Sequence, residues 1–189
     1  YPMFKEIRSR YIRYLVIIIF MIVLFVCMVE VNFLWLFGYS PTAKDIRQPI
    51  QSVASEVYTA DSVLIGRYFK EDRSPVSYDS ISSDVVNALV ATEDIRFFQQ
   101  SGVDFRAIFS SIVATVQGDP RGGSTITQQL AKNLYRTRYN HAVGLLDKIP
   151  GIRILVVKFK EWMTAYKLEG NYGKKDILAM YLNTVSFSN

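Results

Sequence analysis

The residues YLVIIIFMIVLFVCMV, from Tyr14 to Val29, decide the architecture of this 189-residue chain. The run carries no charge and consists almost wholly of apolar side chains. Phe33 to Phe37 extend it past Glu30, so that it reaches the roughly 20 residues that a helix needs to cross a bilayer. The sequence therefore predicts a transmembrane anchor over 14–37.

A cleaved signal peptide is the alternative for an apolar run near the N-terminus. This run is too long for one, and no small-residue cleavage site follows it at once. Lys5, Arg8, Arg10 and Arg13 precede the run, and the positive-inside rule places them in the cytoplasm. We therefore expect a single-pass protein of the cytoplasmic (inner) membrane, with residues 1–13 as a basic cytoplasmic tail and everything after residue 40 outside.

Composition narrows the possible functions. The chain is 50% hydrophobic and 14% aromatic, which excludes a disordered tail. One Cys and one His exclude an internal disulfide framework and a His-rich metal site, and any histidine-based catalysis would have to use His141. The net charge of +5 fits an anionic partner without requiring one. The basic residues do not cluster with aromatic side chains, so we expect no nucleic-acid partner.

The part of the chain beyond the anchor divides into two regions. Residues 38–54 are polar and contain Pro41 and Pro49, which indicates a stalk. Residues 55–189 form one domain that is mainly α, with a small β-hairpin that pairs Glu56–Thr59 with Leu64–Phe69. The helices are predicted near Asp84–Ile95, Phe105–Val116, Thr125–Tyr135, Ile154–Leu168 and Lys175–Leu182.

Two glutamates interrupt apolar helical stripes in this domain. Glu93 continues the stripe that begins at Val86 and Leu89, and Glu161 lies on the stripe that runs from Ile154 to Leu168. A carboxyl that is buried among apolar side chains has a raised pKa and becomes suited to proton transfer. A buried structural pair with Lys or Arg explains the same pattern, and spacing alone does not separate the two interpretations.

The segment RGGSTITQQ, Arg121 to Gln129, predicts a capped helix start. Thr125 with Gln128 matches a capping box, and Ser124 is an alternative cap. A helix N-terminus after two glycines can bind anions, and the basic residues that follow would support a phosphate site. A plain glycine turn with a capped helix is the simpler alternative, and the segment is not a P-loop. The basic residues are Lys132, Arg136 and Arg138.

Four short segments follow one another along the domain. They are EDIRF at Glu93–Phe97 with Gly102, GGSTITQQ at Gly122–Gln129, Lys158 with Glu161, and Lys174 with Ile177-Leu178 and Tyr181-Leu182-Asn183. In this order they resemble the motifs of the family 51 glycosyltransferases, the peptidoglycan transglycosylase domains of class A penicillin-binding proteins. The resemblance covers about residues 55–189.

The resemblance implies a lysozyme-like, mainly α fold that polymerises lipid II into β-1,4 glycan strands and releases undecaprenyl diphosphate. Glu93 matches the general base, and Glu161 matches the glutamate beside the leaving diphosphate. No tightly bound cofactor is expected, although a divalent cation, Mg or Mn, at Glu161 is compatible with the family. The expected partners are lipid II, the growing glycan strand, the membrane and other cell-wall synthesis proteins. The expected substrate-binding residues are Asp94, Phe97, Ser124, Thr127, Gln128, Gln129, Lys132, Arg136, Lys158 and Asn183.

Three departures from the family pattern matter. Gln100 stands where the family often has His, so an amide must replace any hydrogen bond from that ring. Val157 stands where Arg is usual, which removes one expected phosphate contact. The chain stops at Asn189 without the family's fifth motif, so we expect a C-terminally incomplete fragment of a longer protein. Two alternatives stay open: a lysozyme-like enzyme that cleaves glycan, and an inactive membrane-anchored fragment or scaffold.

Overall fold

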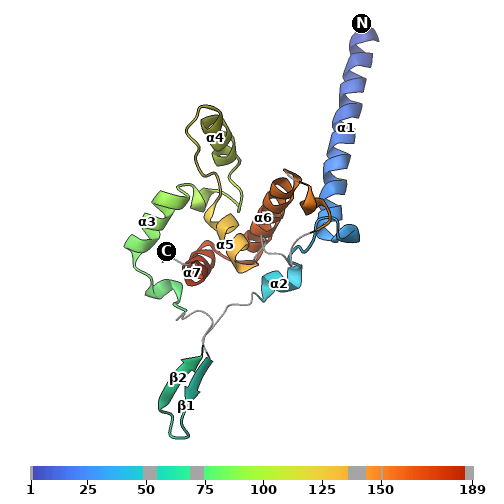
Figure 1. Ribbon diagram of the computed structural model, residues 1–189. Helices are drawn as coiled ribbons and strands as arrows, with labels where there is room; N and C mark the ends of the chain where they lie inside the picture. The colour runs from blue at the N-terminus through green and yellow to red at the C-terminus, as the bar shows by residue number, and fades with distance from the viewer. Residues whose placement is uncertain (1, 49–54, 69–74, 136–143, 150, 186–189) are drawn as a thin grey trace.

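The computed structural model describes residues 2–48, 55–68, 75–135, 144–149 and 151–185. As predicted, this part of the chain is mainly helical with one small antiparallel hairpin (Figure 1). The hairpin and the helices beyond it lie within a few residues of their predicted positions. The elements are α1 Pro2–Glu30, α2 Ala43–Arg47, β1 Ser55–Tyr58, β2 Leu64–Tyr68, α3 Ser83–Glu93, α4 Phe105–Val116, α5 Ile126–Leu134, α6 Ile152–Asn171 and α7 Lys174–Thr184, with short 3-10 turns at Phe33–Trp35, Tyr78–Ser80, Phe97–Gln99 and Leu146–Lys148.

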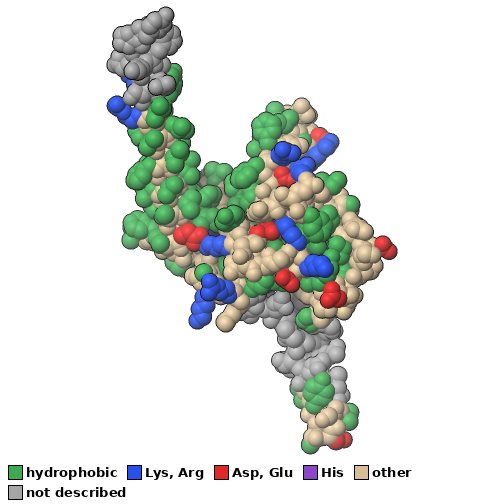
Figure 2. Space-filling model, turned by 180° about the vertical axis from the view of Figure 1, so that it is seen from behind, with side chains coloured by type: hydrophobic (Ala, Val, Ile, Leu, Met, Phe, Trp, Pro, Cys, Tyr) green, Lys and Arg blue, Asp and Glu red, His purple; other side chains and the backbone are tan. Residues whose placement is uncertain are grey.

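Helix α1 contains an apolar segment, Arg10–Glu30, that is long and apolar enough to cross a membrane. It projects from the body of the molecule, and hydrophobic side chains cover it (Figure 2). The helix ends at Glu30, before Phe37, the predicted end of the anchor. The cause is local, because Asn32 and Leu34 both adopt positive φ, at 50° and 49°, and so break the helix.

The residues after this break turn back onto the domain. Val29 of α1 and Phe37 are buried together with Val156 of α6. The ring of Phe25 lies edge-on to Phe37, with centroids 5.3 Å apart, and 5.0 Å from the ring of Phe159 on α6. The end of α1 is therefore packed against α6 rather than joined to the domain by a free linker.

The predicted stalk also differs from the structure. Residues 43–47 form α2, which a capping box between Thr42 and Asp45 begins. Ile46 has no exposed surface and belongs to the main core, and Tyr172 donates a hydrogen bond of 2.8 Å to its carbonyl oxygen. Residues 38–48 are therefore part of the folded body, because burial of Ile46 outweighs the polar composition around it. Residues 49–54 lie outside the described residues.

The main core lies between α3, α5, α6 and α7. Helix α5 is central, and its residues Ile126 and Leu130 have no exposed surface. Side-chain caps fix where three of the helices begin, with Ser82 before α3, Asp104 before α4 and Thr125 before α5. The other fully buried apolar core residues are Phe97, Ala131, Leu168, Ile177 and Leu178.

Helix α4 is the least buried of the domain helices, since none of its residues is buried. Its apolar face carries Phe105, Phe109, Ile112 and Val116, all of which are exposed. In Figures 1 and 2, α4 lies on the side of the body from which α1 extends. The hairpin projects from the other side of the body (Figure 1).

Candidate active site

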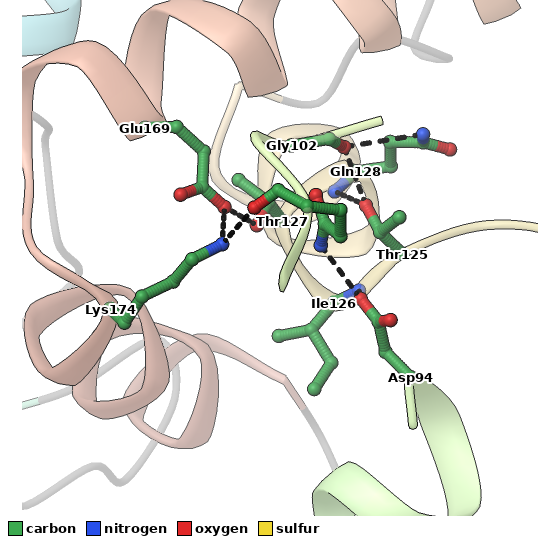
Figure 3. A network of polar contacts seen from close by, with 9 residues as sticks. Asp94, Gly102, Thr125, Ile126, Thr127, Gln128, Glu169 and Lys174 are labelled. Carbon is green, nitrogen blue, oxygen red and sulfur yellow. Dashed lines mark hydrogen bonds and ion pairs between the residues drawn. The ribbon is translucent and has the colours of Figure 1, made fainter. Parts of the chain in front are cut away.

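The start of α5 is the centre of a polar network, shown in Figure 3. The Thr125 hydroxyl accepts a hydrogen bond of 3.1 Å from the backbone N–H of Gln128, which confirms the predicted cap. It also donates to the carbonyl oxygen of Gly102, at 2.7 Å. The Gln128 side chain does not complete the capping box, because its amide donates to the same Gly102 oxygen, at 3.3 Å. The loop at Gly102 is thereby fixed to α5.

Asp94 fixes α3 to the same helix start. Its Oδ2 atom accepts hydrogen bonds from the backbone N–H of Ile126, at 3.2 Å, and from Nε2 of Gln100, at 3.0 Å. Gln100 thus supplies the amide hydrogen bond expected where the family often has His. Burial raises the pKa of Asp94 above its usual range, although these hydrogen bonds and the charge of Lys174 favour its ionised form.

These bonds change the interpretation of the helix end as an anion site. At the first turn of α5, the N–H of Ile126 donates to Asp94 and the N–H of Gln128 donates to Thr125. Two of the donors that a phosphate would need are therefore already used, and one is used by a carboxylate. The predicted anion site must depend on side-chain charges and not on these amides.

A second part of the network joins α5 to the end of α6 and the start of α7 (Figure 3). The Thr127 hydroxyl and the Lys174 ammonium both donate to Oε1 of Glu169, each at 2.7 Å. Lys174 also donates to the carbonyl oxygen of Gln100 at 2.7 Å and lies 4.4 Å from the ring centroid of Phe97. Glu169 has no local signal in the sequence, because its partners Thr127 and Lys174 lie on other helices.

Four residues that we expected to bind substrate are therefore inside the protein. Phe97 and Thr127 have no exposed surface, Gln128 is 1% exposed, and Asp94 is 7% exposed. Asp94, Thr127 and Gln128 make the hydrogen bonds described above, and Phe97 packs in the main core. In this structure they hold α3, α5 and α7 together rather than present groups to a ligand.

Glu93 differs from the prediction in the opposite sense. Val86 and Leu89 of its stripe are buried, but Glu93 itself is exposed, because α3 ends there and its last turn extends beyond the core. Its Oε2 atom accepts a hydrogen bond of 2.7 Å from Nε2 of Gln129. Oε1 of the same amide accepts one of 3.0 Å from the hydroxyl of Tyr181. Glu93 is thus accessible to a ligand and held by a neighbouring side chain.

Glu161 is buried, as its stripe predicted, with 1% of the side chain exposed. Its Oε2 atom lies 3.0 Å from the ammonium nitrogen of Lys158, so a buried Glu–Lys pair is present, as one of the two interpretations requires. Lys158 also donates a hydrogen bond of 2.9 Å to the hydroxyl of Ser124. This cluster therefore places a half-exposed lysine beside the loop that precedes α5. Val157 is buried next to it and contributes no polar group.

The remaining expected site residues have different surroundings. Lys132 is half-buried in the last turn of α5, and within the described ranges no ion pair or hydrogen bond is recorded for its side chain. Asn183 accepts a hydrogen bond from the backbone N–H of Val76 and donates one to its carbonyl oxygen, at 3.0 and 2.9 Å. Asn183 therefore holds the segment before α3. Arg136 and His141 lie outside the described residues.

The surroundings of Glu161 do not fit a metal site made by the protein alone. Among the described residues, no three His, Cys, Asp or Glu side chains converge. The carboxylate of Glu161 is itself paired with Lys158. A single carboxylate with a lysine against it lacks the oxygen ligands that Mg²⁺ requires.

Comparison with known proteins shows which family the chain belongs to. The family model described as transglycosylase matches residues 61–189, which include α3, α5, α6 and α7. The chain belongs to the transglycosylase family. This transglycosylase domain carries the exposed Glu93 and the Lys158–Glu161 pair within the matched residues.

Curated relatives of the transglycosylase domain are penicillin-binding proteins. The chain is 41% identical over 134 residues to penicillin-binding protein 1A of Aquifex aeolicus, covering 70% of this chain and 17% of the relative. It is 38% identical over 146 residues to penicillin-binding protein 1A of Escherichia coli, covering 76% and 15%. Identity to penicillin-binding protein 1F of Bacillus subtilis is 35% over 147 residues, covering 76% and 18%. The chain thus spans less than a fifth of the length of these relatives.

Proposed function

We propose that the transglycosylase domain is a peptidoglycan glycosyltransferase that polymerises lipid II into β-1,4 glycan strands and releases undecaprenyl diphosphate. The observation that carries this proposal is the exposed carboxylate of Glu93, held through one oxygen by Gln129. Its other oxygen makes no recorded hydrogen bond in the part of the chain that the structure describes. That oxygen is available to a substrate hydroxyl.

In the proposed reaction, Glu93 takes the proton from the 4-hydroxyl of the acceptor sugar. The hydroxyl oxygen attacks the anomeric carbon of the donor sugar, and the bond to the lipid diphosphate breaks with inversion at that carbon. A positioned base contributes by accepting the proton as the new bond forms. The exposure of Glu93 supports this role, because an acceptor sugar has to reach the carboxylate directly.

Positive side chains are proposed to stabilise the negative charge that develops on the departing diphosphate. Lys158 is 33% exposed, held beside Ser124, and Lys132 lies on the following helix without a recorded partner among the described residues. A preorganised positive charge that meets developing negative charge is among the strongest catalytic contributions in enzymes. Because two amides at the start of α5 are already bonded, these lysines supply most of the proposed interaction.

The domain is proposed to lie outside the cytoplasmic membrane, anchored by α1. The apolar segment Arg10–Glu30 has the length of a membrane span, and Arg10 and Arg13 lie toward its N-terminal end. The exposed apolar face of α4 lies on the same side of the body, which supports a position of the domain at the membrane surface (Figures 1 and 2). A lipid-linked donor would then approach from the bilayer.

The test is the variant Glu93→Gln in the full-length protein, assayed in detergent with fluorescently labelled lipid II. We expect polymerisation to fall by about a hundredfold to ten-thousandfold, the usual cost of removing a positioned base. Asp79→Asn, which neutralises an exposed carboxylate on the turn before α3, is the matched control and should keep full activity. Circular dichroism checks the fold of both variants.

A second assay separates synthesis from cleavage. Purified glycan strands are incubated with the protein, and release of short fragments is measured. Fragment release without polymer growth would favour the lysozyme-like alternative, for which paired carboxylates alone suffice. Near-normal polymerisation by the folded Glu93→Gln variant would contradict the assignment of the base.

A further inference from the structure

Gln129 connects two side chains from different helices. It lies on α5 between Glu93, the last residue of α3, and Tyr181 of α7. Its amide nitrogen is 2.7 Å from Oε2 of Glu93, and its amide oxygen is 3.0 Å from the hydroxyl of Tyr181. Tyr181 is 2% exposed and Glu93 is exposed, so the chain of bonds runs from the protein interior to the proposed base.

The chemistry of the three groups fixes the direction of these bonds. An ionised carboxylate only accepts hydrogen bonds, so the NH₂ end of the Gln129 amide must face Glu93. The carbonyl end then faces Tyr181 and needs a donor, which a phenolic hydroxyl provides. Burial and the negative charge of Glu93 raise the pKa of Tyr181 above its usual range, so the hydroxyl keeps its proton at physiological pH.

We propose that Tyr181 is a positioning residue for Glu93. By donating to Gln129, it holds the amide in the orientation in which Nε2 binds one oxygen of the Glu93 carboxylate and leaves the other for the acceptor hydroxyl. This inference rests on the proposed role of Glu93 and adds a residue that touches neither substrate nor the reacting atoms. It also reassigns Gln129 from substrate binding to orientation of the base.

The structure explains why the tyrosine hydroxyl is needed. Without it, the half-buried Gln129 carbonyl would have to face the Tyr181 ring without a donor, which is unfavourable for an acceptor that is partly removed from water. Gln129 would then rotate toward another partner and release Glu93. Since Glu93 is exposed at the end of α3, no core packing would keep its carboxylate in place.

The experiment is a double-mutant cycle between Tyr181→Phe and Gln129→Leu in the full-length protein, with kcat and KM measured on labelled lipid II. Tyr181→Phe removes only the hydroxyl and should lower kcat about threefold to tenfold, the usual contribution of one hydrogen bond, with KM unchanged. In the Gln129→Leu background the same change should have no further effect, because Tyr181 acts through Gln129.

Tyr172→Phe is the matched control. It also removes a tyrosine hydroxyl, one that donates a hydrogen bond of 2.8 Å to the backbone of Ile46 in the core. We expect this control to lower the melting temperature without changing kcat. A purely structural role for Tyr181 would give the same result as the control.

Three outcomes would overturn the inference: full kcat in Tyr181→Phe, an equal loss of kcat in both backgrounds, or a raised KM in Gln129→Leu. If Tyr181→Phe does not fold, Gln129→Leu alone decides, and full kcat in that variant overturns the inference. Glu93→Gln is measured alongside these variants. Activity in Glu93→Gln refutes the proposed base, whereas an inactive Glu93→Gln with a fully active Tyr181→Phe refutes only the positioning role.

Discussion

The ammonium nitrogen of Lys158 lies 3.0 Å from the carboxylate of Glu161, yet 33% of the lysine side chain is exposed against 1% of the glutamate. The pair therefore has one member in the core and one at the surface. A buried carboxylate holds the lysine in place, and the exposed part of the lysine remains available to an anion. This arrangement predicts how the activity responds to substitution of the lysine.

Lys158→Ala should weaken the use of the donor by about 2–4 kcal/mol in activation free energy, the usual effect of removing a charge that stabilises a transition state. Lys158→Arg keeps the positive charge against Glu161 and should retain more activity than the alanine variant. Lys148→Ala removes an exposed lysine from the turn before α6 and should have little effect. Lipid II polymerisation measures all three. Equal activity in the three variants would show that Lys158 does not contact the donor.

Gly102→Ala should destabilise the protein by about 1–3 kcal/mol, the usual cost of a strained backbone position. Gly102 has a φ of +88°, and an added Cβ would lie 2.8 Å from the backbone oxygen of Ala165 on α6. Its own carbonyl oxygen accepts the bonds from Thr125 and Gln128, so a shift of the loop also disturbs the start of α5. Urea denaturation measures the change.

Gly170→Ala is the control for that prediction and should have the opposite sign. Gly170 lies in the last turn of α6 with open space where a Cβ would be placed. Alanine there should stabilise the protein by about 0.4–1 kcal/mol by restricting the unfolded chain. Equal effects of the two substitutions would show that the close approach of Gly102 to α6 is not important.

Asp94→Asn should change stability in a pH-dependent way. Because burial raises the folded-state pKa of Asp94, the folded state binds the proton more tightly than the unfolded chain does. The stability that this carboxyl contributes is therefore fully present below its ordinary value of 3.8 and is lost as the pH rises through the raised pKa. Asparagine keeps an acceptor oxygen for the N–H of Ile126 and carries no charge.

The variant should therefore be more stable than the wild type at neutral pH, and this advantage should disappear as the pH falls toward 3.8. Free energies of unfolding, measured by urea denaturation over a pH series, test this expectation. A lower stability of Asp94→Asn at neutral pH would mean that the hydrogen bonds of the charged form outweigh its burial.

A topology reporter fused after Ser40 should be active only outside the cytoplasm. The basis is the basic segment that contains Arg10 and Arg13, which precedes an apolar helix of membrane-spanning length. A second fusion placed before Arg10 should be active only in the cytoplasm. Activity of the Ser40 fusion in the cytoplasm alone would contradict the proposed orientation of α1.

Local patterns in the sequence were enough to predict most of the domain's elements. The apolar period and the cap at Thr125 depend on residues within one or two turns, and both agree with the structure. The apolar stripe of α3 predicted that Glu93 is buried, and this prediction was wrong. Such a stripe indicates which way a side chain points, but it does not indicate how far the core extends. Glu161, in the middle of the long helix α6, was predicted correctly for that reason.

Features that depend on distant partners could not be predicted. The backbone N–H of Ile126 donates to Asp94, which is 32 residues away in the sequence. No local pattern therefore shows that this N–H at the start of α5 already has an acceptor. Ile46 is buried only because α2 packs beneath Tyr135 and Tyr172, which come much later in the chain. The link from Glu93 through Gln129 to Tyr181 likewise joins three helices that only the fold brings together.

The close packing of α1 on α6 determines the distance between the proposed site and the proposed membrane. Lys167 of α6 lies 2.6 Å from Glu30, the last residue of α1, and Glu161 is about 9 Å further along the axis of α6 at 1.5 Å per residue. A site on a flexible tether would sample a range of heights that grows with the tether's length. Here the end of α1 packs directly on α6, which carries Glu161, so in the proposed orientation this contact sets the height of the proposed site. In the proposed reaction, the growing glycan strand would therefore leave the site at a constant height above the bilayer surface.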